Sequence, residues 1–399
     1  MKEISVCEVC DSNSLVSVLD IGASPLCDDL IPFGSDASSK DFPIEILLCT
    51  KCSTAHQRFQ VPPVELFLPS YHYRARMTGS VLEGMRDLVV QCEQRFGDLQ
   101  GLSVLDVGCN DGSLLSIFRE HGCRTIGVEP TDAADDSDHL TIKKFFNADA
   151  VEEILEAIGK PDIITFTNVF AHIDDLNLLL ENLRALIGAN TRIVIENHYL
   201  GAVIKYGQFD TFYHEHPRTY SAQSFKFISQ KLGLDVLDIE FVSRYGGNVR
   251  AFLGKSDHEA AFPEELDFIF GFQKMDSWLK GWIPTTVERL DNIVKEFGKI
   301  PAKAFPGRAS IILKALSVDE RILSAVYEIK GSQKVNHYVP GTRIPILPEK
   351  ELFALVPQPE QILNLAWHIP AEVQANLTKN GYTGQMLSLR TFDPIILFQ

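Results

Sequence analysis

The sequence lacks any run of about 18 or more consecutive apolar residues, so no segment that spans a bilayer is expected. Its N-terminus lacks a basic flank followed by an apolar core, so we expect no signal peptide and a cytoplasmic location. Basic residues are scarce, 37 against 53 acidic ones, which gives a formal net charge of −16. Because nucleic-acid binders usually carry a basic surplus, no nucleic-acid partner is expected. The lack of a long apolar run likewise gives no reason to expect a membrane partner.

The composition is that of soluble globular domains, with 45% hydrophobic and 23% charged residues, which excludes a disordered chain, a collagen-like repeat and a long coiled coil. At about 100–200 residues per domain, 399 residues predict two or three domains. Pattern changes along the chain predict three parts: a metal-binding module at 1–75, a central α/β domain at 76–265 and a smaller α/β domain at 266–399.

Four of the eight cysteines form two Cys-x-x-Cys pairs in the first part, Cys7 with Cys10 and Cys49 with Cys52. Such a pair turns two thiolates toward one corner of a tetrahedron, and two pairs complete the coordination of a zinc ion with no open position. A closed site of this kind supplies folding energy and takes no part in chemistry. The sequence therefore predicts a structural zinc site, with Cys27 and His56 as weaker alternative ligands.

The central part alternates between short apolar strands and amphipathic helices, which predicts a parallel sheet covered by helices on both faces. A helix at 78–96 is expected to precede it. Expected strands lie at 103–107, 124–128, 163–167, 192–196, 236–241 and 248–253, and expected helices at 113–121, 151–158, 176–186 and 224–232. A long helix at 266–297, interrupted near Gly281 and Pro284, is expected to lead to the last part.

A small-residue loop follows the first strand of this region and reads Gly108-Cys109-Asn110-Asp111-Gly112. It is neither a P-loop, because no Gly-Lys-Ser/Thr follows, nor a Gly-x-Gly-x-x-Gly fingerprint. Acidic residues beside the loop disfavour a phosphate and favour a ligand with a positive centre.

The second strand ends at Glu129, 23 residues after Asp106, where a carboxylate can accept the two ribose hydroxyls of an adenosine. The loop and this carboxylate together predict S-adenosylmethionine binding, with a nicotinamide cofactor as the weaker alternative. The residues expected to hold S-adenosylmethionine are Asp106, Gly108, Asn110, Asp111, Gly112, Glu129 and Asn168.

The densest run of ionisable and aromatic side chains is Tyr213-His214-Glu215-His216, in an irregular stretch after the fourth strand. His172 follows the third strand. Ligands of open α/β sheets bind beyond the carboxyl ends of the strands, so these groups are expected beside the cofactor. A neutral histidine is a competent base near pH 7, whereas the His-Glu-x-x-His spacing of a catalytic metal site is absent.

In this order, these features resemble the nucleotide-sugar C-methyltransferases that add a methyl branch at C-3 of 4-keto-deoxyhexoses, and the resemblance covers essentially the whole chain. The most specific match is QFDTFYHEH at 208–216. The segments 108–112, 127–130, 168–172 and 338–346 also match. The resemblance implies a Rossmann-like class I S-adenosylmethionine-dependent methyltransferase core with an N-terminal zinc-binding module and a C-terminal α/β domain.

The resemblance also implies roles. His216 would be the base that removes the C-3 proton, with Tyr213 and Glu215 as its neighbours and His172 facing the sugar. Tyr71 or Tyr73 would belong to an N-terminal aromatic segment that reaches into the site. The acceptor would be a keto-sugar linked to a nucleotide, dTDP or GDP, and the protein a monomer or homodimer.

One segment departs from the family. The position of its Gly-Tyr-Gly-Ala turn, which helps to hold the nucleotide-sugar, reads AFPGRAS at 304–310 here. Two alternative functions stay open: O- or N-methylation of another small acceptor, and a binding module that keeps the fold without the chemistry.

Overall fold

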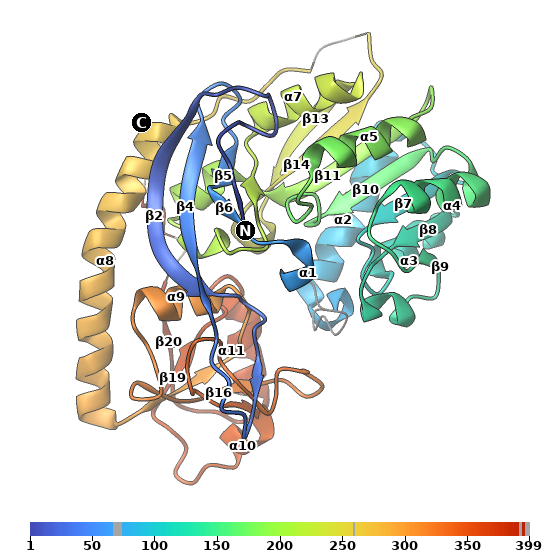
Figure 1. Ribbon diagram of the computed structural model, residues 1–399. Coiled ribbons are helices and arrows are strands. Elements are labelled where there is room, and N and C mark those ends of the chain that lie inside the picture. Colours follow the sequence, from blue (N-terminus) through green and yellow to red (C-terminus); the bar gives the residue numbers. More distant parts are fainter. Residues whose placement is uncertain (67–73, 258–259, 391–392, 396–399) are drawn as a thin grey trace.

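A computed structural model describes residues 1–66, 74–257, 260–390 and 393–395. The chain is built around three sheets: an N-terminal four-stranded sheet, a central seven-stranded sheet and a C-terminal five-stranded sheet (Figure 1).

The central sheet has the order β13-β14-β11-β10-β7-β8-β9. Strands β7 to β11 are parallel, and β14 runs antiparallel to both neighbours. The strands are β7 (Ser103–Val107), β8 (Arg124–Val128), β9 (Leu140–Ile142), β10 (Ile163–Thr167), β11 (Arg192–His198), β13 (Asp235–Val242) and β14 (Asn248–Gly254). The chain winds outward in one direction from β7 to β9 and in the other from β10, so the crevice for a ligand opens beyond the carboxyl ends of β7 and β10.

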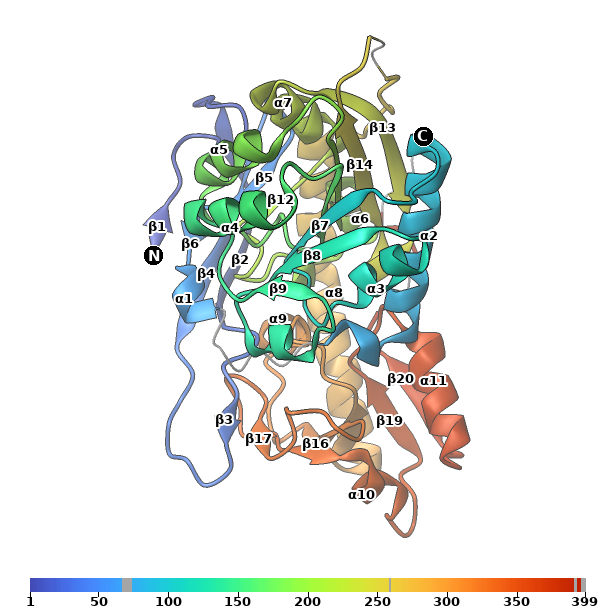
Figure 2. The same ribbon diagram turned by 90° about the vertical axis from the view of Figure 1, so that its right-hand side faces the viewer.

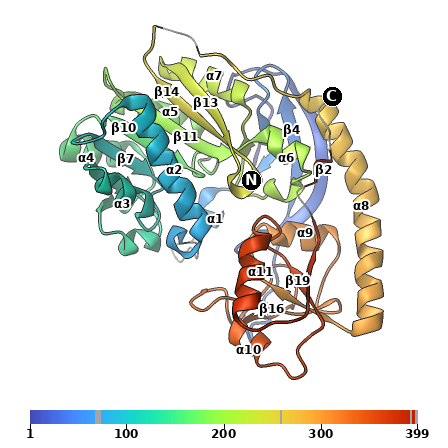
Figure 3. The same cartoon turned by 180° about the vertical axis from the view of Figure 1, so that it is seen from behind.

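Helices cover both faces of this sheet, as expected. One face packs against α2 and α3, which lie in front of the sheet in Figure 3, and the other against α4, α5 and α7. The helices are α2 (Gly79–Phe96), α3 (Ser113–Glu120), α4 (Ala148–Ile158), α5 (Leu176–Leu186), α6 (Leu200–Lys205) and α7 (Ala222–Leu232), with 3-10 turns η1 (Ala75–Met77), η2 (Asp132–Asp136), η3 (Phe209–Thr211) and η4 (Arg244–Gly246).

The N-terminal module is a sheet of order β12-β5-β4-β2, and its edge strand β12 comes from the central domain (Figure 2). Its strands are β2 (Leu15–Pro25), β4 (Asp41–Cys49), β5 (Ala55–Gln57) and β12 (Arg218–Thr219). Shorter elements are β1 (Lys2–Glu3), which pairs with β6 (Phe59–Gln60), β3 (Ile31–Pro32), which pairs with β17 (His337–Tyr338), and α1 (Pro63–Leu66).

The C-terminal sheet is parallel and has the order β18-β16-β15-β19-β20. Its strands are β15 (Ile300–Lys303), β16 (Leu323–Glu328), β18 (Ile346–Pro348), β19 (Gln361–Asn364) and β20 (Gln385–Ser388), and its helices are α9 (Ala309–Ala315), α10 (Glu349–Phe353) and α11 (Pro370–Lys379). The helices α8 and α9 pack on one face, and α10 and α11 on the other, so this domain has three layers.

The long helix α8 (Phe268–Phe297) runs along the outside of the molecule from the central to the C-terminal domain (Figure 1). The expected interruption near Gly281 and Pro284 is wrong: the helix continues through Pro284. Its apolar face, including Phe272 and Leu290 on either side of the proline, is buried in one core, and this packing outweighs the local cost of the proline. None of the helices in the described part of the chain is long and apolar enough to cross a membrane.

Candidate active site

A cavity of about 1480 Å³ lies where the three parts of the chain meet. The carboxyl ends of β7, β8 and β10 contribute one wall, the segment with His216 a second, and the C-terminal domain a third. The N-terminal module contributes Cys27 and Asp28. Any ligand that fills this cavity therefore contacts all three parts.

Five of the residues expected to hold the cofactor line the first wall: Asp106, Gly108, Asn110, Glu129 and Asn168. Glu129 is buried and accepts hydrogen bonds from the backbone N–H of Asn110, at 3.0 Å, and from the hydroxyl of Thr131. Burial raises the pKa of Asp106 to about 7, although a hydroxyl donates a hydrogen bond to its carboxylate. A cationic ligand beside Asp106 would favour the charged carboxylate.

Asp111 and Gly112 are not among the described residues that line the cavity. Asp111 accepts hydrogen bonds from the N–H and hydroxyl of Ser113, at the start of α3, and from the backbone N–H of Arg76. Gly112 has a φ of 75° and provides the turn into α3. The structure thus gives both residues contacts that shape the loop, and direct contact with the cofactor stays a prediction for them.

Gly108 allows the loops after β7 and β10 to approach each other. Its φ is +72°, and a Cβ atom there would lie 2.5 Å from Cγ2 of Val169. We expect Gly108→Ala to lower the affinity for S-adenosylhomocysteine at least tenfold, about 1.4 kcal/mol, because backbone strain and the clash both displace the cofactor loop. Isothermal titration calorimetry measures this.

The matched control for this change is Gly159→Ala. Gly159 has a similar φ of +70°, but no atom lies within 4 Å of the position that a Cβ would take, and the residue ends α4 away from the cavity. Gly159→Ala therefore introduces the backbone strain of a positive φ without the steric clash. Equal affinities of the two variants for S-adenosylhomocysteine would contradict the prediction that Gly108 belongs to the cofactor wall, which is the first wall of the cavity, formed by the ends of β7, β8 and β10.

Three histidines meet in the second wall. The ring centroids of His172 and His216 lie 4.7 Å apart, and those of His198 and His216 lie 5.2 Å apart. Tyr213 packs against His216 at 4.2 Å. The structure therefore brings together His172, Tyr213 and His216, which the sequence singled out, and places His198, from the polar end of β11, beside them.

The ring of His216 is held in one tautomer. Its Nδ1 lies 2.9 Å from the carbonyl oxygen of Thr211, which can only accept, so Nδ1 carries the proton and Nε2 keeps its lone pair. Burial, together with His172 and His198, holds the pKa of His216 well below its ordinary value. The imidazole is therefore neutral at pH 7, the form that can take up a proton.

Glu215 also lines the cavity, with a carboxylate oxygen 3.9 Å from Nδ1 of His172. Burial and the neighbouring Asp28 raise the pKa of Glu215 well above its ordinary value. His214 points elsewhere: its Nε2 lies 3.1 Å from the carbonyl oxygen of Phe42. The predicted Tyr71, and the alternative Tyr73, fall outside the described residues.

The sequence did not single out two cavity residues of the C-terminal domain, Arg308 and His368, or Gln57 of the N-terminal module. Arg308 lies in the segment noted only for its departure from the family. Gln57 is buried, and its Nε2 lies within hydrogen-bond distance of the carbonyl oxygens of Tyr213, at 2.6 Å, and His216, at 3.2 Å. No local pattern marks these residues, because their partners are distant in sequence.

The buried histidines predict a loss of stability in mild acid. Burial lowers the pKa of His172 and His214 to about 4 and of His368 to about 3, and it also lowers those of His198 and His216. In the unfolded chain each has a pKa near 6.5 and takes up a proton first. The stabilisation is therefore complete above about pH 6.5 and is lost as the pH falls toward 4, at up to about 1.4 kcal/mol per pH unit for each histidine.

Urea unfolding at pH 7.5, 6 and 5 measures this. The carboxyls with raised pKa values, Asp106, Glu215 and Glu265, act in the opposite direction and offset part of the slope. In His214→Gln, one fewer proton is taken up on unfolding, so the slope of the unfolding free energy against pH should fall by up to about 1.4 kcal/mol per pH unit. Unchanged unfolding midpoints between pH 7.5 and 5 would refute the prediction.

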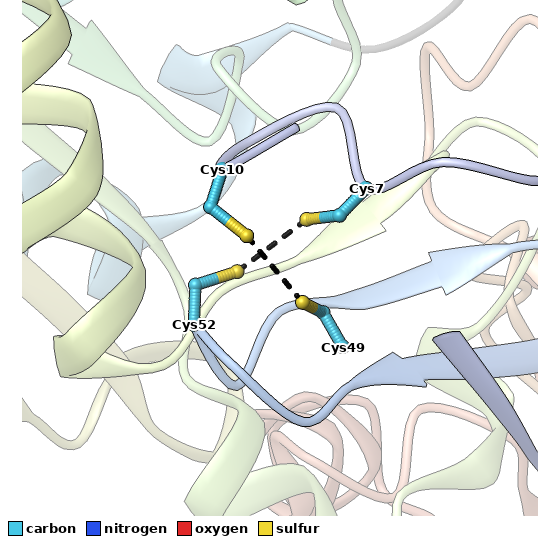
Figure 4. A group of neighbouring side chains, drawn as sticks. All are labelled: Cys7, Cys10, Cys49 and Cys52. Atoms are coloured by element: carbon cyan, nitrogen blue, oxygen red, sulfur yellow. Dashed lines mark hydrogen bonds between the residues drawn. The ribbon is translucent and has the colours of Figure 1, made fainter. Parts of the chain in front are cut away.

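The four cysteines predicted to bind zinc come together, with their sulfur atoms all within 4.8 Å of one another (Figure 4). The Sγ atoms of Cys7 and Cys52 are 3.4 Å apart, and those of Cys10 and Cys49 are 3.5 Å apart. Sulfur atoms about 2.3 Å from a tetrahedral zinc ion would be roughly 3.8 Å from each other, so the cluster fits this ion. Neither Cys27 nor His56 belongs to the cluster, although Nε2 of His56 lies 3.3 Å from Sγ of Cys7.

Comparison with known families finds three successive matches. Residues 7–67 match a putative zinc binding domain, residues 73–239 a methyltransferase domain, and residues 246–387 a C-methyltransferase C-terminal domain. The expected fold, with its S-adenosylmethionine-binding core and its zinc module, is thereby confirmed.

Among individual proteins, C-methyltransferase NovU of Streptomyces niveus is 28% identical over 403 aligned residues, which cover 94% of this chain and 93% of that protein. A ubiquinone biosynthesis O-methyltransferase of Bradyrhizobium diazoefficiens is 31% identical over 104 residues, which cover 24% of this chain and 40% of that enzyme. A solved SAM-dependent methyltransferase from Archaeoglobus fulgidus is 20% identical with a TM-score of 0.34, and the alignment covers 43% of this chain and 94% of that one.

Proposed function

The chain is a homologue of S-adenosylmethionine-dependent C-methyltransferases over nearly its whole length, and from this premise we propose that it methylates C-3 of a nucleotide-linked 4-keto-deoxysugar. The observation that carries the proposal is the neutral His216. Its Nδ1–H is held by the carbonyl of Thr211, and the residue lines the same cavity as the loops proposed to hold the cofactor.

Carbon methylation needs such a base. A saturated carbon has no lone pair with which to attack a sulfonium methyl group, but the C–H beside a ketone is acidic because the carbanion delocalises onto the carbonyl oxygen. In the proposed step, Nε2 of His216 takes the C-3 proton and the C-3–H electron pair forms the enolate. S-adenosylmethionine, when bound, would supply the methyl group: the enolate carbon would bond to it, and the electron pair of the broken S–CH3 bond would stay on sulfur.

The other residues then have defined tasks. Glu129 would accept hydrogen bonds from the ribose hydroxyls, and Asp106, Gly108 and Asn168 would complete the cofactor wall. Tyr213 and, in its protonated form, Glu215 would donate hydrogen bonds to the acceptor, and His172 would face its ring. These assignments rest on the positions of the residues in one cavity.

The C-terminal domain supports a nucleotide-linked acceptor. Its parallel sheet changes winding direction at β15, so its own ligand crevice opens beyond Lys303, where residues 304–308 line the cavity. The segment that departs from the family therefore still faces the ligand space. We propose dTDP or GDP as the nucleotide carrier, in a cytoplasmic enzyme.

Proton exchange in deuterated water tests the function. A dTDP- or GDP-linked 4-keto-6-deoxysugar is incubated with the holoenzyme and S-adenosylhomocysteine, and NMR follows deuterium at C-3. We expect deuterium to enter at C-3 only when His216 is present. We expect methylation at C-3 once S-adenosylmethionine replaces S-adenosylhomocysteine. An acceptor that becomes methylated on oxygen or nitrogen without any C–H exchange would instead show the alternative O- or N-methyltransferase.

A further inference from the structure

We infer that Arg308, supplied by the C-terminal domain, is a further catalytic residue whose guanidinium stabilises the negative charge that develops on the acceptor's carbonyl oxygen. This inference rests on the proposed enolate chemistry and adds the cation that such chemistry uses. Arg308 is 8% exposed and lines the cavity together with Tyr213 and His216.

Two sides of the guanidinium are held by the segment that carries the base. Nε of Arg308 donates to Oδ2 of Asp210 at 2.7 Å, and Nη2 donates to Oγ1 of Thr211 at 2.7 Å. The carbonyl of the same Thr211 accepts from Nδ1 of His216. The cation and the base are therefore anchored on one residue, which fixes their separation.

The third nitrogen, Nη1, makes no hydrogen bond to any residue in the described part of the chain, and its donors are available to a ligand. A guanidinium carries five N–H donors and stays charged at all relevant pH values. Since Arg308 lines the cavity and its other donors face η3, Nη1 is the group positioned to reach an acceptor.

The charges around Arg308 favour an anion. Asp210 is fully buried and contacts two arginines, Arg308 and Arg390, and also accepts from Trp367. One carboxylate against two guanidinium groups leaves this cluster with one positive charge. Three histidines that line the same cavity, His198, His216 and His368, are neutral at pH 7, since burial and Arg308 itself lower their pKa values.

A preorganised cation in such a site acts on the step that creates charge. When the C-3 proton moves to His216, the ketone oxygen gains the negative charge, and donors already in place stabilise it without reorganisation. Loss of one such donor typically slows a reaction about 10²–10³-fold. Arg308 would share this task with Tyr213.

The experiment compares Arg308→Gln and Arg308→Lys with the matched control Arg390→Gln, because Arg390 contacts the same Asp210 but does not line the cavity. C-3 deuterium exchange and binding of S-adenosylhomocysteine are measured for each. We expect Arg308→Gln to slow exchange at least ~100-fold with the cofactor affinity unchanged, Arg308→Lys to recover part of the rate, and methylguanidinium to rescue Arg308→Gln. Arg390→Gln removes one charge from this cluster but no donor that lines the cavity, so it should slow exchange far less than Arg308→Gln does.

Other outcomes overturn the inference in recognisable ways. Equal slowing in Arg308→Gln and Arg390→Gln would reduce Arg308 to an anchor for Asp210. A higher KM at unchanged kcat would place the guanidinium on the diphosphate of the acceptor. Equal exchange rates in the parent and in Arg308→Gln would refute the role of Arg308 but leave the proposed function intact. A parent that shows no exchange at all would refute the proposed function itself. Should Arg308→Gln fail to fold, the rate of Arg308→Lys decides.

Discussion

Replacing His216 by asparagine is expected to slow C-3 proton exchange and methyl transfer by at least ~100-fold and up to about 10⁴-fold, the range typical of a lost general base. Asparagine can still donate to the carbonyl of Thr211, which Nδ1 of His216 contacts at 2.9 Å, but it offers no basic nitrogen. Binding of S-adenosylhomocysteine should not change. NMR of deuterium wash-in and a methyl-transfer assay with the keto-sugar nucleotide measure the effect.

His214→Asn is the matched control. His214 lies two residues away in the same segment, but it contacts the carbonyl of Phe42 and is not among the described residues lining the cavity. Its exchange rate should stay within a few-fold of the parent. If His216→Asn exchanged protons as fast as His214→Asn, a different base would have to be sought, with His172 or His198 as the next candidates.

The second large effect concerns the cysteine cluster. Cys49→Ser, or treatment with a strong chelator, is expected to unfold the N-terminal module, since structural zinc supplies about 10–16 kcal/mol of apparent binding free energy in zinc-finger peptides. The parent should contain one zinc ion per chain by elemental analysis. Thermal unfolding and elemental analysis of the variant measure both losses together.

Loss of the metal should also impair the proposed catalysis, because the zinc module directly supports the segment that carries His216. Its strand β5 pairs with β12, which begins two residues after His216. Gln57 holds the carbonyls of Tyr213 and His216. Between the first two cysteines, Glu8 pairs with the buried Arg218 at 2.5 Å.

We therefore expect proton exchange to fall at least ~100-fold in Cys49→Ser, while the affinity for S-adenosylhomocysteine falls less than about tenfold, because the cofactor wall comes from β7, β8 and β10. Cys123→Ser provides the control. Cys123 is buried, lies outside the cluster, and donates a weak hydrogen bond to the carbonyl of Leu99. A zinc-free protein with the stability and exchange rate of the zinc-loaded one would disprove the link.

Several parts of the fold could be predicted because short-range patterns encode them. The strands at 103–107, 124–128 and 163–167 have the predicted bounds, since each is a short apolar run between turns. One exception was α8, where Pro284 led us to expect a break in the helix. Packing on both sides of Pro284 decided otherwise, and a local pattern contains no information on such packing.

The candidate site divides along the same line. The sequence by itself determined the four zinc-binding cysteines, the glycine turn at Gly108 and the run that ends at His216. Each of these motifs consists of residue types with a specific chemistry at short spacings along the chain. Only the tertiary structure decided that Gln57 meets the carbonyls of Tyr213 and His216 and that Arg308 meets Asp210 across 98 positions. Such contacts depend on how three separately wound sheets dock against one another, and burial and charge pairing at those interfaces act between residues that no spacing along the chain relates.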